Sequence, residues 1–582
     1  MTTPLQVLKG MGGANKMAEY IGQTWHKYNI ERNPIVGSWK ELRNYIFATD
    51  TSTTTNSKLP WKNSTTIPKL CQIRDNLHSN YISALFPNDD WLRWEAYTAS
   101  DDTDNKRKAI ESYISNKTRT SHFRTEMSKL LLDYIDYGNA FATVLYESSF
   151  VENNRGEKTV SYMGPRVKRI SPLDIVFNPL ATSFKDSFKI IRSLYSIGEL
   201  TSMAQNQPEN SALRKALEGR QAIINAGRQF GWEDLNKAEG MQIDGFGNYE
   251  TYLQSNYVEV LTFYGDIFDE NEVLRTGREI MVIDRFFVVE DKPFPSWLGH
   301  APIYHVGWRS RPDNLWSMGP LENLVGMQYR LDHLENVKAD AMDLAIMPPL
   351  VIQGEVEAFD WGPNAEIHID ENGAVTELAR NVQWVIQADN SIDRLEMRME
   401  QYAGAPREAM GIRSAGEKTM YEVQQLQNAA GRIFQEKTTH FEIELLEQVL
   451  NAMLEVARRS MDREDVARVI DNDLGVTSFM KITKDDITAS GKLRPIGARH
   501  FAAKAQLVQN ITGLANTQLW QQIAPHVNTK NLTVMVEDML GLSRFDLFSP
   551  NSAVYEGAEQ QRLSAIAQDE NQLAMEQEVP EM

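Results

Sequence analysis

The closest match to a nucleotide-binding motif is the segment GIRSAGEKT, which runs from Gly411 to Thr419. A P-loop requires the pattern G-x-x-x-x-G-K-[ST], because its lysine and backbone amides must converge on the phosphates. Here Glu417 separates Gly416 from Lys418, which displaces the lysine and adds a negative charge where phosphate would lie. We also expect no buried strand before the segment. We therefore interpret it as a loop that ends at a helix cap, and we predict no nucleotide site.

Acidic groups are the next candidates for chemistry. The sequence DNDLG at 471–475 departs from the calcium-loop pattern D-x-[DN]-x-[DN]-G and lacks the distal glutamate. A second group could hold Mg²⁺ for a nuclease, but charge runs usually form a solvated surface. This group comprises Asp266, Asp269, Glu270 and Glu272. The ten histidines form no H-x-x-x-H or H-E-x-x-H pair, and there is no G-x-S-x-G elbow. The sequence therefore predicts no enzyme activity, catalytic residue, metal or cofactor.

Composition limits the class of protein. The chain of 582 residues is long enough for several hydrophobic cores, since a single core stops growing at roughly 250–300 residues. The one cysteine, Cys71, excludes an intrachain disulfide and a cysteine-based zinc site, and we expect a reducing cytoplasm. No run approaches the roughly 18 apolar residues of a membrane span. The net charge of −19 argues against a protein that grips nucleic-acid phosphates tightly.

The elements that must position any site alternate between helix and strand in the first half of the chain. Helical spacing of apolar residues predicts helices over 14–33, 37–50, 66–85, two between 104 and 136, and 208–229. Short or alternating apolar runs predict strands over 91–97, 140–148, 158–164, 171–179, 257–268, 278–291 and 301–308. Trp91, Trp94 and Tyr97 could stack nucleic-acid bases, but we expect them to pack in a core.

The second half contains a long helix with a clear start. Gly319 is a suitable cap, Pro320 suits the first helical position, and Glu322 falls in the first turn. The helix is expected over 321–347, a span of about 40 Å at 1.5 Å per residue. Pro348 and Pro349 would end it.

A small insert and further helices follow. We predict strands over 365–370 and 374–379, a helix over 391–402, and a loop rich in small residues over 403–418. Thr419 and Glu422 form a T-x-x-E capping box, which would open a very long helix ending near Met461. Residues 493–542 are expected to be helical, and the acidic tail over 556–582 to be mobile.

This succession resembles the phage portal proteins, the head-to-tail connectors of double-stranded DNA bacteriophages. The stretches 59–87, 89–97 and 170–179 look like the short-tailed branch of that family. The resemblance implies an α+β, mainly helical subunit with wing, stem, clip and crown regions. It also implies a cyclic ring with a central channel, through which DNA is packaged and ejected without catalysis by the ring itself.

The resemblance also assigns regions and partners. The regions are a wing over 1–320, a stem helix over 321–347, a clip over 348–388, a returning stem helix over 389–402, a tunnel loop over 403–418, a long helix with more wing over 419–492, a crown over 493–555, and the acidic tail over 556–582. The implied partners are eleven further copies in a dodecamer, double-stranded DNA, the major capsid protein and scaffold, the terminase large subunit, and tail adaptor or nozzle proteins. No membrane is implied. The implied location is the capsid portal vertex of the virion, after assembly in the host cytoplasm.

Ring symmetry would multiply each charge on the axis, because every side chain recurs in every subunit. The candidates for channel lining on the stem helix are Glu322, Asp332, Glu335, Asp340, Asp343, Arg330 and Lys338. Their acidic majority would repel the DNA phosphates and keep the duplex centred.

The tunnel loop differs from the stem helix because it is slightly basic. We predict Arg407 and Arg413, followed by Lys418, as the residues nearest DNA. In the alternative interpretation, these side chains pair with acidic residues of neighbouring subunits and only stabilise the ring.

Two other functions stay open. The chain could be a catalytic component of the packaging machinery, an ATPase or a nuclease, which would need a P-loop or a metal-binding acidic cluster. It could also be another structural protein of the virion tail. Such a protein would usually be richer in strands and would lack paired helices around a small strand-rich insert.

Overall fold

The computed structural model describes residues 14–47, 63, 65–86, 91–98, 101, 104–152, 158–205, 208, 211–225, 257–268, 274–283, 285, 287–346, 350–353, 374–377, 383–404, 433–461, 465–470 and 477–495. They contain both helices and strands, which confirms the mixed α+β class. The chain divides into two compact units, residues 1–463 with 484–495 and residues 464–483 with 496–582. The described part of the second unit is an antiparallel hairpin of β14 (Asp465–Ile470) and β15 (Thr477–Ile482).

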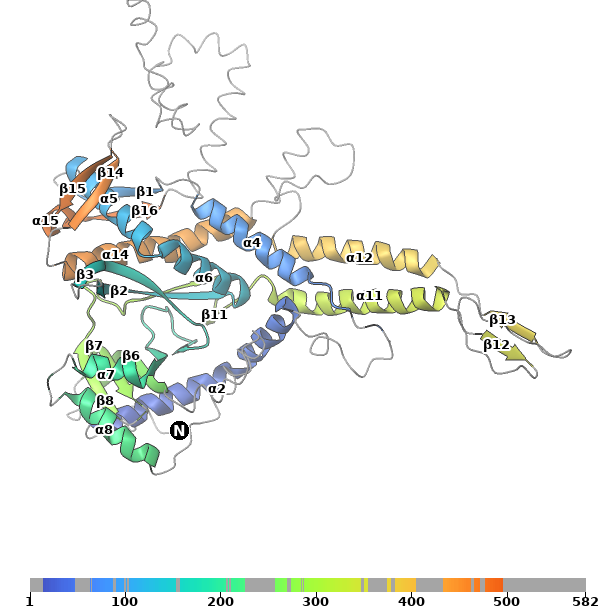
Figure 1. The fold of residues 1–582 in the computed structure, drawn as a ribbon, viewed down its shortest axis with the longest axis horizontal. Helices are drawn as coiled ribbons and strands as arrows, with labels where there is room; N and C mark the ends of the chain where they lie inside the picture. Colours follow the sequence, from blue (N-terminus) through green and yellow to red (C-terminus); the bar gives the residue numbers. More distant parts are fainter. Residues whose placement is uncertain are drawn as a thin grey trace, which may run out of the picture. The chain divides into compact units, whose positions relative to one another are not determined.

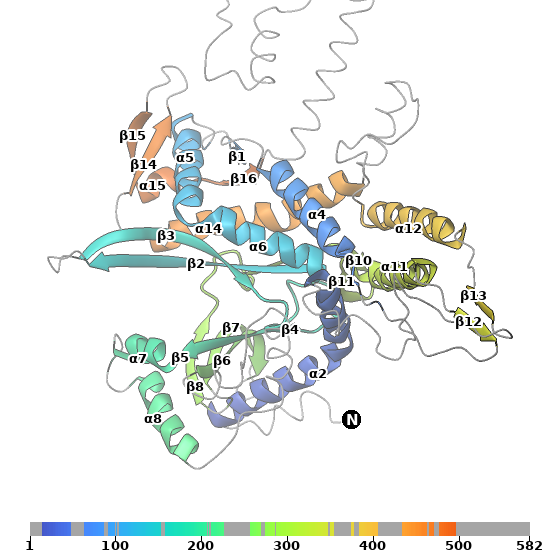
Figure 2. The ribbon, with the colours of Figure 1, turned by 45° about the vertical axis from the view of Figure 1, so that its right-hand side comes forward.

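A three-stranded antiparallel sheet lies at the centre of the first unit (Figure 2). Its middle strand β2 (Asn139–Glu152) pairs with β3 (Lys158–Ile170) and with β9 (Ile303–Gly307). Two helices, α6 (Phe123–Asp136) and α14 (Glu447–Ser460), pack against it. Val144 of β2 is buried, and Phe141 is buried in a cluster with Phe177 and Trp316. Burial of these side chains accounts for the apolar character predicted for the strand.

A second sheet has the antiparallel order β4-β5-β6-β7-β8. The strands are β4 (Ile175–Phe177), β5 (Lys189–Ser196), β6 (Tyr257–Phe268), β7 (Leu274–Ile283) and β8 (Phe287–Pro293). Side chains alternate along a strand, so successive residues of β6 point to opposite faces. Leu261 and Phe263 pack against α2 (Ala14–Phe47), whereas Val258 and Val260 pack against α7 (Ile197–Gln205) and α8 (Ala212–Asn225). The range 278–291, predicted as a strand, contains parts of two strands, β7 and β8, which are joined by a turn at Arg285.

The first helix differs from its prediction. Helix α2 continues through Pro34, where we expected two separate helices over 14–33 and 37–50. A proline inside a helix removes one hydrogen bond and costs about 3 kcal/mol. Burial on both sides of Pro34 outweighs this cost, since Trp25 and Trp39 are each 1% exposed. The helix bends along its length (Figure 1), as is usual at a proline.

The segment SPLDIVFNP at 171–179 owes its conformation to α2. The Arg32 guanidinium is buried and donates to the carbonyl oxygens of Pro172, Leu173 and Ile175, at 2.7, 2.9 and 2.6 Å. These bonds satisfy the carbonyl groups just before and within the short strand β4. The predicted strand is confirmed, and Arg32 is the side chain that holds it.

A two-stranded pairing corrects the predicted crown region. Strand β1 (Leu92–Ala96) pairs with β16 (Gly491–Pro495), so residues 493–495 are strand and not the start of a helix. The rest of the predicted crown lies outside the described residues. Trp91 and Trp94 are buried, as predicted, but the prediction for Tyr97 is wrong because 69% of its surface is exposed at the end of β1.

The remaining helices largely follow their predictions. Helix α4 (Lys69–Leu85) lies within the predicted range 66–85, and α5 (Asp104–Thr120) is followed by α6 as expected. The long helix is described from residue 433, contains a π-turn at Glu442–Leu446, and ends at Ser460. Its predicted start at Thr419 and Glu422 lies outside the described residues. A short helix α15 (Lys484–Ile487) and the hairpin β10 (Arg309–Arg311) with β11 (Asn314–Met318) complete the first unit. None of the helices in the described ranges is long and apolar enough to span a membrane.

Candidate functional site: a helical arm and its attachment

Two antiparallel helices and a small hairpin form a helical arm, defined here as residues 325–402. It consists of α11 (Val325–Ile346), β12 (Leu350–Gln353), β13 (Ala374–Glu377) and α12 (Gln383–Tyr402). Figures 1 and 2 show the two helices side by side, with the hairpin at the end away from the sheets. The predicted order of helix, strand-rich insert and returning helix is thereby confirmed.

Two details of the arm differ from prediction. The partner of β13 is Leu350–Gln353, which follows the prolines directly, and the predicted strand 365–370 lies outside the described residues. Helix α12 begins at Gln383, eight residues before the predicted start at Ser391. Its early turns meet α11, where Lys338 of α11 contacts Asp389 at 3.0 Å. A tertiary contact of this kind extends a helix beyond the range that its own apolar spacing indicates.

The start of the arm is anchored to α2. The Glu322 carboxylate accepts hydrogen bonds from the Gly319 amide at 3.2 Å and from the Trp39 indole at 3.3 Å. Burial raises the pKa of Glu322. The predicted start of the helix is wrong by two residues. Gly319 was expected as the cap and Pro320 as the first helical residue, but the N-cap is Leu321, which precedes a short 3-10 turn at Glu322–Leu324. Gly319 is needed for a different reason, since a Cβ there would lie 2.9 Å from the Ile135 carbonyl oxygen.

We predict a large stability loss for Trp39→Ala. The indole is 1% exposed, and its ring centroid lies 5.0 Å from that of Tyr137 and 5.6 Å from that of Trp316. Its removal should lower the free energy of unfolding by about 3–5 kcal/mol, measured by urea titration. The matched control is Trp297→Ala, because 64% of Trp297 is exposed. The control should change stability by less than about 0.5 kcal/mol. Equal losses in the two variants would contradict the anchoring role of Trp39.

A segment named here the strap, comprising residues 63 and 65–67, lies along one face of α11. Asp332 Oδ1 accepts from the Ile67 amide at 2.9 Å, and Gln328 Nε2 donates to the Ile67 carbonyl at 2.6 Å. Asn336 accepts from the Thr65 amide at 2.6 Å and donates to the Thr65 carbonyl at 3.1 Å. The side chains of α11 therefore serve the backbone of the strap as a neighbouring strand would.

The polar ladder continues to the first described residue of the strap. Asp340 accepts from the amide of Asn63 at 2.9 Å and from its side chain at 2.8 Å, and Asp343 accepts from the same side chain at 2.9 Å. The spacing explains the fit. Four residues of helix advance about 6.0 Å, and two residues of extended chain advance about 6.7 Å. Polar side chains four apart on α11 therefore match every second residue of the strap.

The chain just after the strap binds the other arm helix. Lys69 is 3% exposed, and its ammonium group contacts Glu400 of α12 at 2.7 Å and Glu396 at 3.1 Å. The strap thus holds α11 through its backbone, and Lys69 holds α12. We did not predict this junction. The available signal was the row of polar residues at four-residue spacing, Gln328, Asp332, Asn336 and Asp340.

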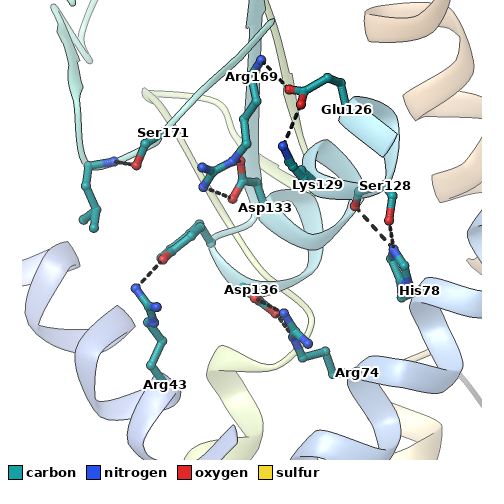
Figure 3. A network of polar contacts seen from close by, with 12 residues as sticks. Arg43, Arg74, His78, Glu126, Ser128, Lys129, Asp133, Asp136, Arg169 and Ser171 are labelled. Atoms are coloured by element: carbon teal, nitrogen blue, oxygen red, sulfur yellow. Dashed lines mark hydrogen bonds and ion pairs between the residues drawn. The ribbon is translucent and has the colours of Figure 1, made fainter. Parts of the chain in front are cut away.

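A network of ion pairs and hydrogen bonds joins α4, β3 and α2 to α6 and the residue after it (Figure 3). Arg74 of α4 makes two hydrogen bonds to Asp136, at 2.6 and 2.8 Å. Arg169 of β3 makes two to Asp133, at 2.5 and 2.7 Å. His78 of α4 contacts the hydroxyl of Ser128 at 2.9 Å. The labelled side chains in Figure 3 point toward one another from α4, α6 and β3, so the network is structural in character.

The carboxyl groups of this network are already engaged by arginine side chains. Burial raises the pKa of Asp133 to about 7 and also raises the pKa of Asp136. Each carboxylate is already bound by two nitrogens of an arginine, which leaves no room for a shared metal ion. Among the described residues there is no group of three or more histidine, cysteine, aspartate or glutamate side chains placed to hold a metal. In the predicted loop cluster, Asp266 accepts from the Gly277 amide at 2.8 Å, and its three other members lie outside the described residues.

The predicted channel-lining residues have different positions. Glu322 accepts a hydrogen bond from Trp39 of α2, and Asp332 accepts one from the strap. The prediction that these two residues line a channel is therefore wrong. Asp340 binds the strap, and Lys338 contacts Glu335 at 2.7 Å as well as Asp389. Exposed positions are occupied by Arg330 and Asp343. The tunnel-loop residues Arg407, Arg413 and Lys418 lie outside the described residues.

The arm is thus a pair of helices with a hairpin at one end, and buried polar contacts hold the other end. No protein family model matches the chain, and no curated protein is significantly similar to it.

Proposed function

We propose that the chain is a portal subunit, which assembles into a ring at the capsid vertex and conducts double-stranded DNA. The observation that carries the proposal is the arm. It consists of two paired helices around a small hairpin. The sequence predicts a small-residue loop over 403–418 between the arm and the helix that ends at Ser460. This order is the one that portal subunits use for stem, clip, returning stem, tunnel loop and long helix. The charge of −19 suits a channel that must let DNA slide.

The proposal gives each region a role. The sheets with α2, α6 and α14 would form the wing that contacts the capsid, and the hairpin β12–β13 with its flanking residues would form the clip. The clip would bind the terminase large subunit during packaging and tail proteins afterwards. Arg330 and Asp343, the exposed members of the predicted set on α11, are the preferred candidates for the channel surface.

The test is the assembly state of the purified full-length chain. Light scattering should give the mass of a ring of about twelve copies of the 66.3 kDa subunit. Negative-stain images should show a central hole wide enough for a DNA duplex. A monomer that hydrolyses ATP, or that cuts DNA with a metal ion, would contradict the proposal and favour a catalytic packaging component. Extended or non-circular assemblies would favour a tail protein.

A further inference from the structure

Two buried oxygen atoms lack a donor in the contact between the strap and α11. Gln328 and Asp332 are 0% and 7% exposed, and they touch each other, since Gln328 Nε2 donates to Asp332 Oδ1 at 2.9 Å. Among the described residues, neither Asp332 Oδ2 nor Gln328 Oε1 has a hydrogen-bond partner. The amide cannot be reversed to remove the problem, because its nitrogen also donates to the Ile67 carbonyl oxygen. A buried acceptor without a donor is costly, and a buried negative charge is costlier still.

Among the described residues, no cation is paired with Asp332. No salt bridge to Asp332 occurs in the described part of the chain. From α2, Tyr45 is in electrostatic contact with Asp332, and Glu41 of the same helix acts on Tyr45. The ammonium group of Lys69, which follows the strap, is engaged by Glu396 and Glu400 of α12. On α11 itself, Arg330 and His333 are near in sequence, and Lys338 is paired with Glu335 and Asp389.

We propose that Asp332 is a proton-operated latch, which holds the strap on α11 when its carboxyl group is protonated and loosens the strap when the group ionises. A proton on Oδ2 removes the buried charge, while Oδ1 continues to accept from the Ile67 amide. Ionisation restores the charge, and detachment of the strap relieves its cost by admitting water. The latch is independent of the portal assignment.

The direction of the pH effect follows from the burial of the carboxyl group. Burial raises the pKa of Asp332 to about 6. A detached, hydrated carboxyl would have a pKa near the ordinary 3.8. Between these values the attached state binds more protons than the detached state, so attachment weakens as the pH rises through this range. From pH 5 to pH 8, linkage with these two pKa values weakens the attachment about tenfold.

The experiment is hydrogen–deuterium exchange of the full chain at pH 5 and pH 8, corrected for the intrinsic exchange rate at each pH. The protection of the Thr65 and Ile67 amides should fall about tenfold at the higher pH. In Asp332→Asn the fall should disappear, because the asparagine side chain is uncharged at either pH. The matched control is Asp340→Asn, which alters a carboxylate of the same ladder, and it should keep the tenfold fall.

Each other result would overturn the latch. Equal protection of the wild-type amides at the two pH values would exclude it. A fall that persists in Asp332→Asn would place the titrating group elsewhere. Failure of Asp332→Asn to fold would show that the site requires a charge, because a neutral side chain of the same shape should fit at least as well.

Discussion

Alanine at both Arg407 and Arg413 is expected to leave rings intact and most capsids without retained DNA. These arginines lie in the predicted tunnel loop, and under the portal proposal each is repeated around the channel. Loss of two positive charges per subunit would remove two of the three basic side chains predicted to lie nearest the phosphates. The measurement is the amount of nuclease-protected DNA in particles assembled with the variant, beside images of the purified ring.

A matched control uses an acidic residue of the same loop. Glu408→Gln also changes the loop by one charge per subunit, but it removes a repulsive group, so packaging should be unimpaired. Normal packaging by the double-alanine variant would show that the loop does not contact DNA. Loss of the rings themselves would support the other interpretation, in which these arginines pair with acids of neighbouring subunits.

Asp136→Ala should cause one of the largest losses of stability in the first unit. The side chains of Arg74 and Asp136 are 13% and 10% exposed and are joined by two hydrogen bonds. Removal of the carboxylate leaves a buried guanidinium without its partner, which costs about 3–5 kcal/mol. The free energy of unfolding in urea is the quantity to measure.

Two further variants separate the ion pair from simple truncation. Glu95→Ala breaks the exposed pair of Glu95 and Arg494, whose side chains are 51% and 47% exposed, and it should cost less than about 1 kcal/mol. The double variant Arg74→Met with Asp136→Leu should recover much of the lost stability, because buried ion pairs are often replaceable by packed apolar groups. A double variant as unstable as Asp136→Ala would attribute the loss to shape and not to charge.

Local patterns in the sequence predicted most helices and strands of the described residues. Helix α4 and strand β6 both carry a clear apolar period, and each was found within or at its predicted limits. The failures arise where a distant contact decides the conformation. Strand β16 is short, and its pairing with β1 joins residues that lie 399 positions apart, such as Glu95 and Arg494. No local pattern contains such a partner.

The arm illustrates the same limit for function. The order of its elements was visible from capping and apolar spacing, but the direction of its acidic side chains was not. Asp332 was expected to face a channel and instead accepts from the backbone of the strap, about 265 residues earlier in the chain. An extended backbone offers its donors and acceptors whatever its side chains are, so the strap carries little signal in its own sequence.

The attachment of the arm has a mechanical consequence. Lys69, Arg74 and His78 lie on successive turns of α4 and join it to α12 at one end and to α6 further along. Helix α4 is therefore held at two places, by Lys69 at its first residue and by the buried pair of Arg74 and Asp136 about one and a half turns further along. A load on the hairpin β12–β13 would pass along α12 to Lys69, and then along α4 to the buried pair of Arg74 and Asp136.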